Sequence, residues 1–246
     1  MNRPISISLM LGLLLQACGA SSFVHLRIAE ESLYKKGKEL IVIEESTKAL
    51  DIEESAEAYY MRGVAHNDLD NFAKAQEDLS SAIRMNSKVA KYHYVLGNNY
   101  DDQNEFKSAI NSYSQAIEIQ PKHINAIGNR AFAKRSIGDL NGAIQDFSMA
   151  INIDPMHANN LRMRGNLKYQ LNDFSSALDD YNKAASIDPK IADEKAWRSD
   201  VHADVLFDRG YALFRLERIS EACSDWEESL ALGNDDSSTP IKYYCQ

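Results

Sequence analysis

Small and apolar residues recur through the middle of the chain with a period of 34 residues. Glycine or alanine marks one set of equivalent positions, alanine marks two more, and proline marks a fourth. The sets are Gly63, Gly97, Ala131 and Gly165; Ala75, Ala109, Ala143 and Ala177; Ala82, Ala116, Ala150 and Ala184; and Pro121, Pro155 and Pro189. Since four sets share one period, the pattern predicts a stack of equivalent units, each burying its apolar face against its neighbours.

Each unit has the pattern of a helical hairpin. From Ile124 the sequence predicts one helix, a turn at Gly138 and Asp139, and a second helix from about Leu140 that ends before Pro155. The small residues let two antiparallel helices cross closely. A large side chain fills the wider gap on each second helix: Leu79, Tyr113, Phe147, Tyr181 and Trp226.

This pattern resembles the tetratricopeptide repeat (TPR). One unit meets the signature almost in full, with Leu96, Gly97, Tyr100, Ala109, Tyr113, Ala116 and Pro121. The resemblance implies an all-α, right-handed superhelical solenoid of antiparallel helix pairs. It places four repeats at 56–89, 90–123, 124–157 and 158–191, an insertion at 192–202, and a fifth repeat at 203–234. Residues 24–55 resemble a degenerate N-terminal helix pair, and 235–246 form a C-terminal tail.

Arginine and aspartate occur as a pair in four of the five repeats. Arginine stands at the seventh position, and aspartate follows sixteen residues later: Arg62 and Asp78, Arg130 and Asp146, Arg164 and Asp180, Arg209 and Asp225. The second repeat lacks both, having Leu96 and Ser112 instead. Our hypothesis is a bidentate ion pair between the two helices of a unit. The alternative is that these are independent polar surface residues.

Residues 1–17 have the layout of a bacterial lipoprotein signal peptide. Arg3 precedes an apolar stretch, 5–15, that is too short to cross a bilayer as a permanent helix. The sequence Leu-Gln-Ala-Cys at 15–18 resembles a lipobox, which implies that Cys18 receives the lipid and begins the mature chain. An ordinary cleaved signal and an uncleaved anchor are the alternatives.

The residues after Cys18 suggest where the protein would lie. Residues 18–23 would form a short tether from the lipid to the helices. Gly19 follows the cysteine, whereas aspartate there retains enterobacterial lipoproteins in the inner membrane. We therefore expect a lipid-anchored protein of the bacterial cell envelope, on the outer membrane and facing the periplasm, and the chain as a whole resembles TPR-containing envelope lipoproteins.

The two other cysteines fit an exported protein. Cys223 and Cys245 are an even remainder once Cys18 is acylated, and an oxidising compartment favours a disulfide between them. The alternative is a buried free thiol at Cys223 and a frayed Cys245.

The net charge is −9, and removal of Arg3 gives −9 − 1 = −10 for the mature chain. This balance argues against nucleic acid and favours basic partner segments.

The resemblance also implies a partner-binding groove, because the first helices of TPR units line a concave face. The family register assigns these residues to it: Tyr60, Asp68, Tyr94, Asn98, Asp101, Asp102, Phe132, Arg135, Arg162, Asn166, Tyr169, Tyr211, Phe214 and Arg215. Aromatic residues suit anchors for an extended peptide or a helix. Aspartates gather toward the N-terminal half and arginines toward the other. The alternative is that the aromatic residues pack against neighbouring repeats.

More specialised functions find little support. TPR domains that grip a C-terminal carboxylate use lysine and arginine at positions where this chain has Tyr94, Asn159 and Met163. The six histidines have no zinc-binding spacing, and neither a phosphate-binding glycine loop nor a nucleophile elbow is present. We predict no enzyme, cofactor or metal. We expect an adaptor or scaffold for other envelope proteins; the alternatives are a glycan-binding or peptidoglycan-fragment module and a structural subunit that self-assembles through its end repeats.

Overall fold

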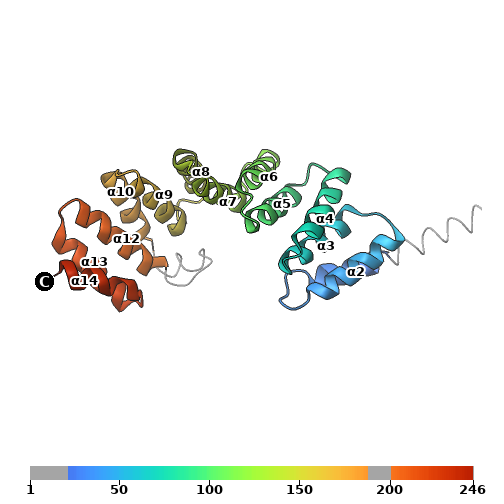
Figure 1. Cartoon of the computed structure of the whole chain (residues 1–246), viewed down its shortest axis with the longest axis horizontal. Helices are drawn as coiled ribbons and strands as arrows, with labels where there is room; N and C mark the ends of the chain where they lie inside the picture. Colours follow the sequence, from blue (N-terminus) through green and yellow to red (C-terminus); the bar gives the residue numbers. More distant parts are fainter. Residues whose placement is uncertain (1–21, 188–200, 246) are drawn as a thin grey trace, which may run out of the picture. The chain divides into compact units, whose positions relative to one another are not determined.

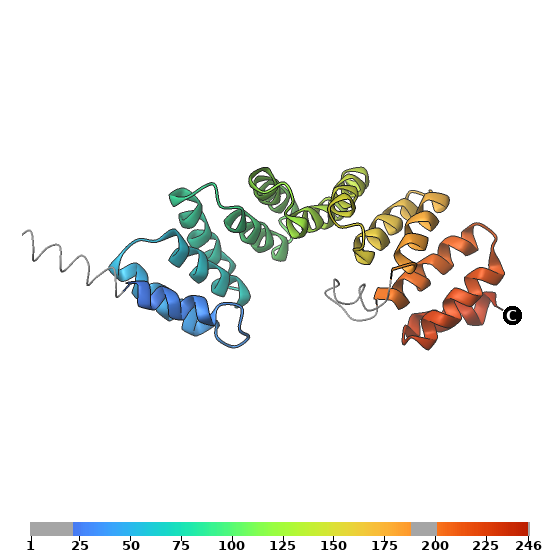
Figure 2. The same cartoon turned by 180° about the vertical axis from the view of Figure 1, so that it is seen from behind.

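The computed structural model describes residues 22–187 and 201–245. The chain divides into two compact units, Met1–Pro121 and Lys122–Gln246, which are described separately below. Within the described residues every regular element is a helix, and consecutive helices pack as antiparallel pairs (Figure 1; Figure 2 gives the view from behind). The predicted all-α solenoid of helix pairs is therefore confirmed. The signal peptide, Cys18 and Gly19, and most of the predicted insertion, lie outside the described residues.

The first unit begins with a helix that includes residues 22–32. It continues with α2 (Glu39–Ile52), α3 (Ala56–Asp68), α4 (Phe72–Met85), α5 (Ala90–Asp102) and α6 (Phe106–Ile119). α3 pairs with α4, α5 pairs with α6, and α2 packs on α3. Val42, Met61 and Leu79 are buried between the early helices and form part of a shared core.

The second unit contains two complete pairs, a third pair after the undescribed segment, and a terminal helix. Its elements are α7 (Ile124–Ser136), α8 (Leu140–Ile153), α9 (Ala158–Gln170), α10 (Phe174–Ala185), α12 (Val201–Arg215), α13 (Ile219–Ala231), η1 (Asp235–Ser237) and α14 (Ser238–Tyr244). α12 begins at Val201 rather than at Ala203, so the last two residues of the predicted insertion are helical. The predicted tail is also largely helical, as η1 and α14.

A left-handed residue ends the first helix of every repeat. Asp70, Asn104, Gly138, Asn172 and Glu217 occupy the same repeat position, with φ between 57° and 83°. The amide of the next residue then donates to a carbonyl of the last helical turn, as Asp139 N does to Lys134 O at 2.9 Å. Asp139 also caps α8 by accepting from Gly142 N at 2.9 Å. Each helical hairpin is thus closed by local backbone geometry.

Small residues at the helix crossings are required by the rings beside them. A Cβ atom on Gly97 would lie 2.5 Å from the Tyr113 ring, and one on Gly210 would lie 2.4 Å from Trp226 Nε1. Such contacts are far shorter than van der Waals distance, so the two helices approach this closely only because the glycine has no side chain. These crossings hold the first helix of each repeat in place, and that helix carries the predicted groove residues.

Candidate functional site

The structure brings all four predicted arginine–aspartate pairs together. In each pair the guanidinium donates two hydrogen bonds to one carboxylate, with Nη2–Oδ1 distances of 2.7 Å for Arg62–Asp78 and 2.6 Å for Arg164–Asp180. The other two pairs, Arg130–Asp146 and Arg209–Asp225, have the same geometry at 2.7 Å. All four aspartates are buried. These residues therefore join the two helices of a repeat and are not independent surface charges.

These ion pairs make two further kinds of contact that the sequence did not predict. In two repeats the arginine also reaches back to the preceding helix: Arg62 Nη1 donates to Thr47 Oγ1 at 3.2 Å, and Arg164 Nη1 donates to Ser148 Oγ at 3.0 Å. In two repeats a lysine four residues after the arginine shares the aspartate, as Lys134 Nζ does with Asp146 at 2.8 Å. His66 holds that lysine position in the first repeat.

Each unit has a first-helix face, which we define as the surface presented by its first helices: α3 and α5 in the first unit, and α7, α9 and α12 in the second. In the first unit a cavity of about 280 Å³ lies beside the end of α3. Its lining residues are Ser32, Leu33, Tyr34, Lys35, Lys36, Glu39, Val42, Ala65 and Asp68. Of the predicted groove residues, Asp68 forms part of its wall, and most of the other lining residues come from the preceding loop and helices.

The carboxylates of this unit affect one another. Partial burial raises the pKa of Asp68, and the charges of Glu39 and Asp102 raise it further. Burial and the charge of Asp102 also raise the pKa of Asp101. Asp102 accepts a hydrogen bond from Asn67 Nδ2 at 3.0 Å. Burial and the charge of Asp102 both disfavour the ionised forms of Asp68 and Asp101, so a bound positive charge nearby would favour those forms.

The aromatic residues of the first unit divide into buried and exposed members. Tyr60 is buried, with its ring centroid 5.1 Å from that of Tyr92. Burial is the main cause that raises the pKa of Tyr60. Its hydroxyl lies 2.5 Å from that of Tyr34. Tyr34 itself is 73% exposed and has a left-handed φ of 63°, which is strained for a large residue. Tyr34 lies outside the repeats, so the family register gave no signal for it.

Two predicted groove asparagines support buried tyrosines. The Tyr113 hydroxyl donates to Asn98 Oδ1 at 3.0 Å, and the Tyr181 hydroxyl donates to Asn166 Oδ1 at 2.6 Å. Tyr94 is half-buried, with its ring centroid 6.0 Å from that of Tyr113. Each asparagine thus satisfies a hydroxyl that would otherwise be buried without a partner.

Arg162, another predicted groove residue, links α9 to α12 inside the second unit. Its guanidinium contacts Asp204 at 2.7 Å and Asp208 at 2.6 Å. We call these contacts the Arg162 clasp. Burial raises the pKa of Asp208, while Arg162 and a hydrogen bond from Asn166 oppose that shift. The clasp connects the fourth and fifth repeats across the undescribed residues 188–200.

The remaining groove residues of the second unit are mostly packed. The rings of Phe132 and Phe147 pack edge to face with their centroids 5.3 Å apart. The guanidinium of the exposed Arg135 lies over the Phe132 ring. Tyr169 contacts Phe174, which Arg215 covers at 4.3 Å from the ring centroid. Tyr211 and Phe214 surround Trp226. Arg135 and Arg215 are therefore the predicted groove residues of this unit that are most exposed.

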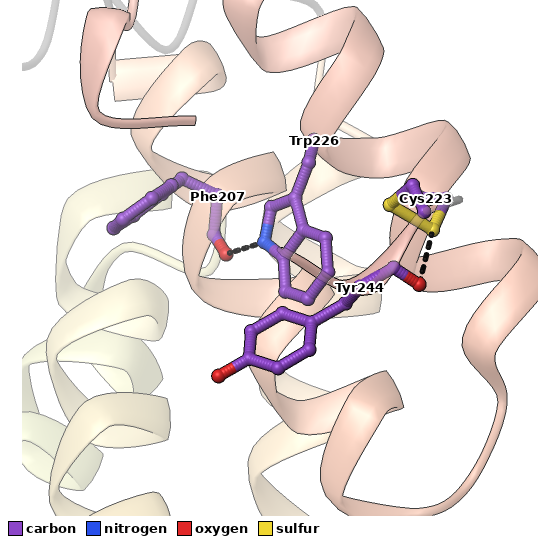
Figure 3. Close-up of a disulfide and its surroundings, with 5 residues drawn as sticks. Phe207, Cys223, Trp226 and Tyr244 are labelled. Atoms are coloured by element: carbon purple, nitrogen blue, oxygen red, sulfur yellow. Dashed lines mark hydrogen bonds between the residues drawn. A yellow bond between two sulfur atoms is a disulfide. The ribbon is translucent and has the colours of Figure 1, made fainter. Parts of the chain in front are cut away.

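A disulfide joins Cys223 on α13 to Cys245 after α14, so the alternative of two free thiols is not what the structure has (Figure 3). The ring of Tyr244 lies 4.4 Å from Phe214 and 6.0 Å from Trp226. Trp226 Nε1 donates to the carbonyl of Phe207 at 3.2 Å (Figure 3). The C-terminal helix thus covers the apolar end of the fifth repeat.

The described residues provide neither a metal-binding group nor a helix that could cross a membrane. Across 22–187 and 201–245, histidine, cysteine, aspartate and glutamate nowhere gather in a group that could hold a metal ion. In the same ranges no helix combines the length and the apolar character needed to cross a membrane.

Three family models, each described as a tetratricopeptide repeat, match residues 56–89, 90–123 and 162–238. Among curated proteins, human "Tetratricopeptide repeat protein 6" is 27% identical over 95 residues, which are 39% of this chain. The match spans only 18% of that longer protein.

Several solved structures share the fold at low sequence identity. Pseudomonas aeruginosa pilF aligns over 92% of this chain and 99% of its own, with a TM-score of 0.71 and 14% identity. YrrB, described as "a TPR protein with an unusual peptide-binding site", aligns over 80% and 97%, with a TM-score of 0.65 and 16% identity. MamA of Desulfovibrio magneticus RS-1 aligns over 68% and 94%, with a TM-score of 0.62 and 15% identity.

Proposed function

The chain is a tetratricopeptide repeat protein, and on that premise we propose that it is a non-catalytic adaptor that binds segments of other proteins on its first-helix faces. Repeat arrays of this family are generally non-catalytic and bind proteins or peptides. We propose further that the adaptor works in the bacterial cell envelope and is held on the outer membrane, facing the periplasm, by acyl chains on Cys18. The lipobox-like sequence 15–18 and the disulfide both support that compartment.

The observation that carries the binding proposal is the cavity of the first unit. It has room for one large side chain. Its wall holds two carboxylates (Glu39 and Asp68) and two lysines (Lys35 and Lys36), and Tyr34, with its exposed ring, also lines it. A lysine or arginine side chain matches this combination, because the carboxylates neutralise its charge and the ring contacts its apolar stem. We therefore propose that the bound segment is basic and that one of its cationic side chains enters the cavity.

Two other features support the same surface. The strained backbone of Tyr34 is the kind of local strain that concentrates at functional sites. Asp102 on α5 repels both Asp68 on α3 and Asp101, so acidic side chains are also present on these two helices beyond the cavity. The peptide-binding site named for YrrB, a protein of the same fold, is consistent with such use.

Site-specific crosslinking tests this proposal. A photoreactive amino acid in place of Tyr34, in the full-length protein in intact cells, is expected to capture basic segments of other envelope proteins, which mass spectrometry identifies. The same amino acid at Glu118, an exposed position on α6, serves as the control site. Capture of the same segments at both sites would contradict the proposal. Capture of glycan alone would support carbohydrate binding, and capture of the protein's own peptides alone would support self-assembly.

Synthetic peptides of the captured segments then measure the role of charge. The variant D68N/D101N/D102N is expected to bind them about tenfold more weakly or worse, equivalent to about 1.4 kcal/mol. The matched control E77Q/E118Q/D179N removes the same number of charges from exposed positions on second helices and should bind as the wild type does. Equal loss in both variants would show that net charge, and not this surface, drives binding.

A further inference from the structure

The helix that includes residues 22–32 exposes apolar side chains between residues 23 and 28 that the fold does not use. Phe23 is 64% exposed, Val24 is 52% exposed and Ile28 is 40% exposed. The opposite side of the same helix supplies core contacts through Leu26 and Ala29, and Leu33 in the following turn adds another. The helix is therefore apolar on two sides at its beginning, and only one of these sides is covered by the protein.

The position of these exposed side chains in the chain limits what can cover them. Phe23 is five residues after Cys18, and an extended chain spans at most about 3.5 Å per residue, so the two are at most roughly 18 Å apart. Acyl chains on Cys18 would keep Phe23 within that distance of the bilayer surface. At such a distance the effective concentration of lipid far exceeds that of any diffusing protein.

Charged residues farther along the helix limit the depth of contact. Arg27 and Glu31 form an exposed ion pair at 3.0 Å, one to two turns beyond Phe23. Burying this pair in hydrocarbon would be costly, whereas the headgroup region accommodates it. The arrangement fits shallow insertion of the first turn and not burial of the whole helix.

We propose that Phe23 and Val24 insert among the lipid headgroups, so that the helix at residues 22–32 seats the first unit on the membrane that holds Cys18. This inference rests on the proposed lipid anchor. The anchor would fix the distance of the first unit from the membrane, and the insertion of Phe23 and Val24 would add a second point of contact that gives it a preferred orientation.

Fluorescence quenching by brominated lipids tests the contact. The acylated full-length protein, carrying F23W, is placed in vesicles of phosphatidylethanolamine and phosphatidylglycerol with brominated acyl chains, and the signal of the native tryptophans is subtracted. We expect the fluorescence of the introduced tryptophan to fall at least twofold. The control Y243W replaces a residue that is 68% exposed at the other end of the chain, and its fluorescence should be unchanged.

Three results would overturn the inference. The first is equal quenching, or none, in F23W and Y243W on protein whose mass shows an acylated Cys18. The second is efficient crosslinking between position 23 of two copies, because the turn would then be covered by a second chain. The third is an unmodified Cys18 in purified protein, which also removes the lipid anchor from the proposed function. The mass measurement thus separates failure of the contact from failure of the anchor.

A second variant shows whether the contact orients the protein. F23S/V24S changes exposed side chains only, so we expect its thermal unfolding to match that of the wild type. On vesicles, the rate of trypsin cleavage at Lys35, Lys36 and Lys38 should differ several-fold between this variant and the wild type, because the variant no longer holds the first unit in one orientation on the bilayer. Equal cleavage rates would overturn the orienting role.

Discussion

Two residues that face each other across the helix crossing vary together from repeat to repeat: the large residue of the second helix and its neighbour on the first helix. Where the large residue of the second helix is tyrosine, as in Tyr113 and Tyr181, the facing position on the first helix is asparagine and accepts its hydroxyl. Where the large residue is Phe147, the facing position is Phe132, and the two rings pack edge to face. Each of these repeats therefore matches polarity across its own helix crossing, and groove asparagines carry a stabilising role that limits how freely they can change.

His66 makes the stability of the first unit sensitive to pH. Its Nδ1 is buried without a hydrogen-bond partner, at the repeat position where Lys134 bonds to Asp146. Burial lowers the pKa of His66 below its ordinary 6.5; the charges of Lys74 and Arg62 also lower it, and only Asp78 opposes them. Since the unfolded chain binds the proton more tightly, protonation favours unfolding, and the stabilising effect of neutral His66 is lost as the pH falls through 6.5.

We therefore expect the wild type to lose thermal stability relative to H66Q between pH 7.5 and pH 5. Melting temperatures of both proteins across this range provide the measurement, and their difference cancels the titration of groups that they share. The variant H66K is expected to lose this pH dependence as well, and to gain an ion pair with Asp78 like those of the third and fourth repeats. A constant difference between wild type and H66Q would show that His66 does not titrate in this range.

At the scale of single elements, α14 depends on the disulfide. Its seven residues are too few to form a stable helix alone, so its position rests on the Cys223–Cys245 bond and on Tyr244 packing against Phe214. We expect C223S/C245S to lose about 3 kcal/mol of unfolding free energy, from the loop of 22 residues that the bond closes. Urea denaturation measures the loss, and Y243S, which changes an exposed residue of the same helix, should show none.

The elements that could be predicted from the sequence are those that repeat. α3, α5, α7 and α9 begin at Ala56, Ala90, Ile124 and Ala158, the residues where the repeats were expected to start. The small-residue positions and the arginine–aspartate spacing could be predicted because several copies of one pattern reinforce each other, four copies in the case of the arginine–aspartate pairs. α14 occurs once, so its helix and its contacts with Phe214 had no repeated signal.

The candidate site was less predictable, for a related reason. The family register gives the direction in which a position points but not its partner, so Arg162 and Asn166 were placed in the groove without the contacts that hold them. Tyr34 lies in a loop before the first full repeat, and its exposure depends on a single left-handed residue. Such a feature follows from tertiary contacts and not from periodicity.

At the scale of the whole molecule, the two units differ in the charge that their first helices present. The first unit has Asp68, Asp101 and Asp102, whereas the exposed groove residues of the second unit are Arg135 and Arg215. The excess of acidic residues, net −9, is therefore not spread evenly between the two first-helix faces. A basic segment should therefore favour the first unit and an acidic segment the second, since the opposite choice would bring like charges together.

The Arg162 clasp has a consequence for the integrity of the chain. Leu161 and Ile187 pack with Val205, and Arg162 bonds to α12 directly, so α12 is held by contacts that do not pass through the peptide backbone between 188 and 200. A protease site placed in that segment should therefore yield two fragments that elute together in gel filtration after cleavage. In the R162M variant the two fragments should separate at a lower urea concentration than in the wild type. The two fragments, made separately, carry complementary surfaces and should therefore reassemble on mixing. Such a pair could report when two proteins fused to the fragments come together.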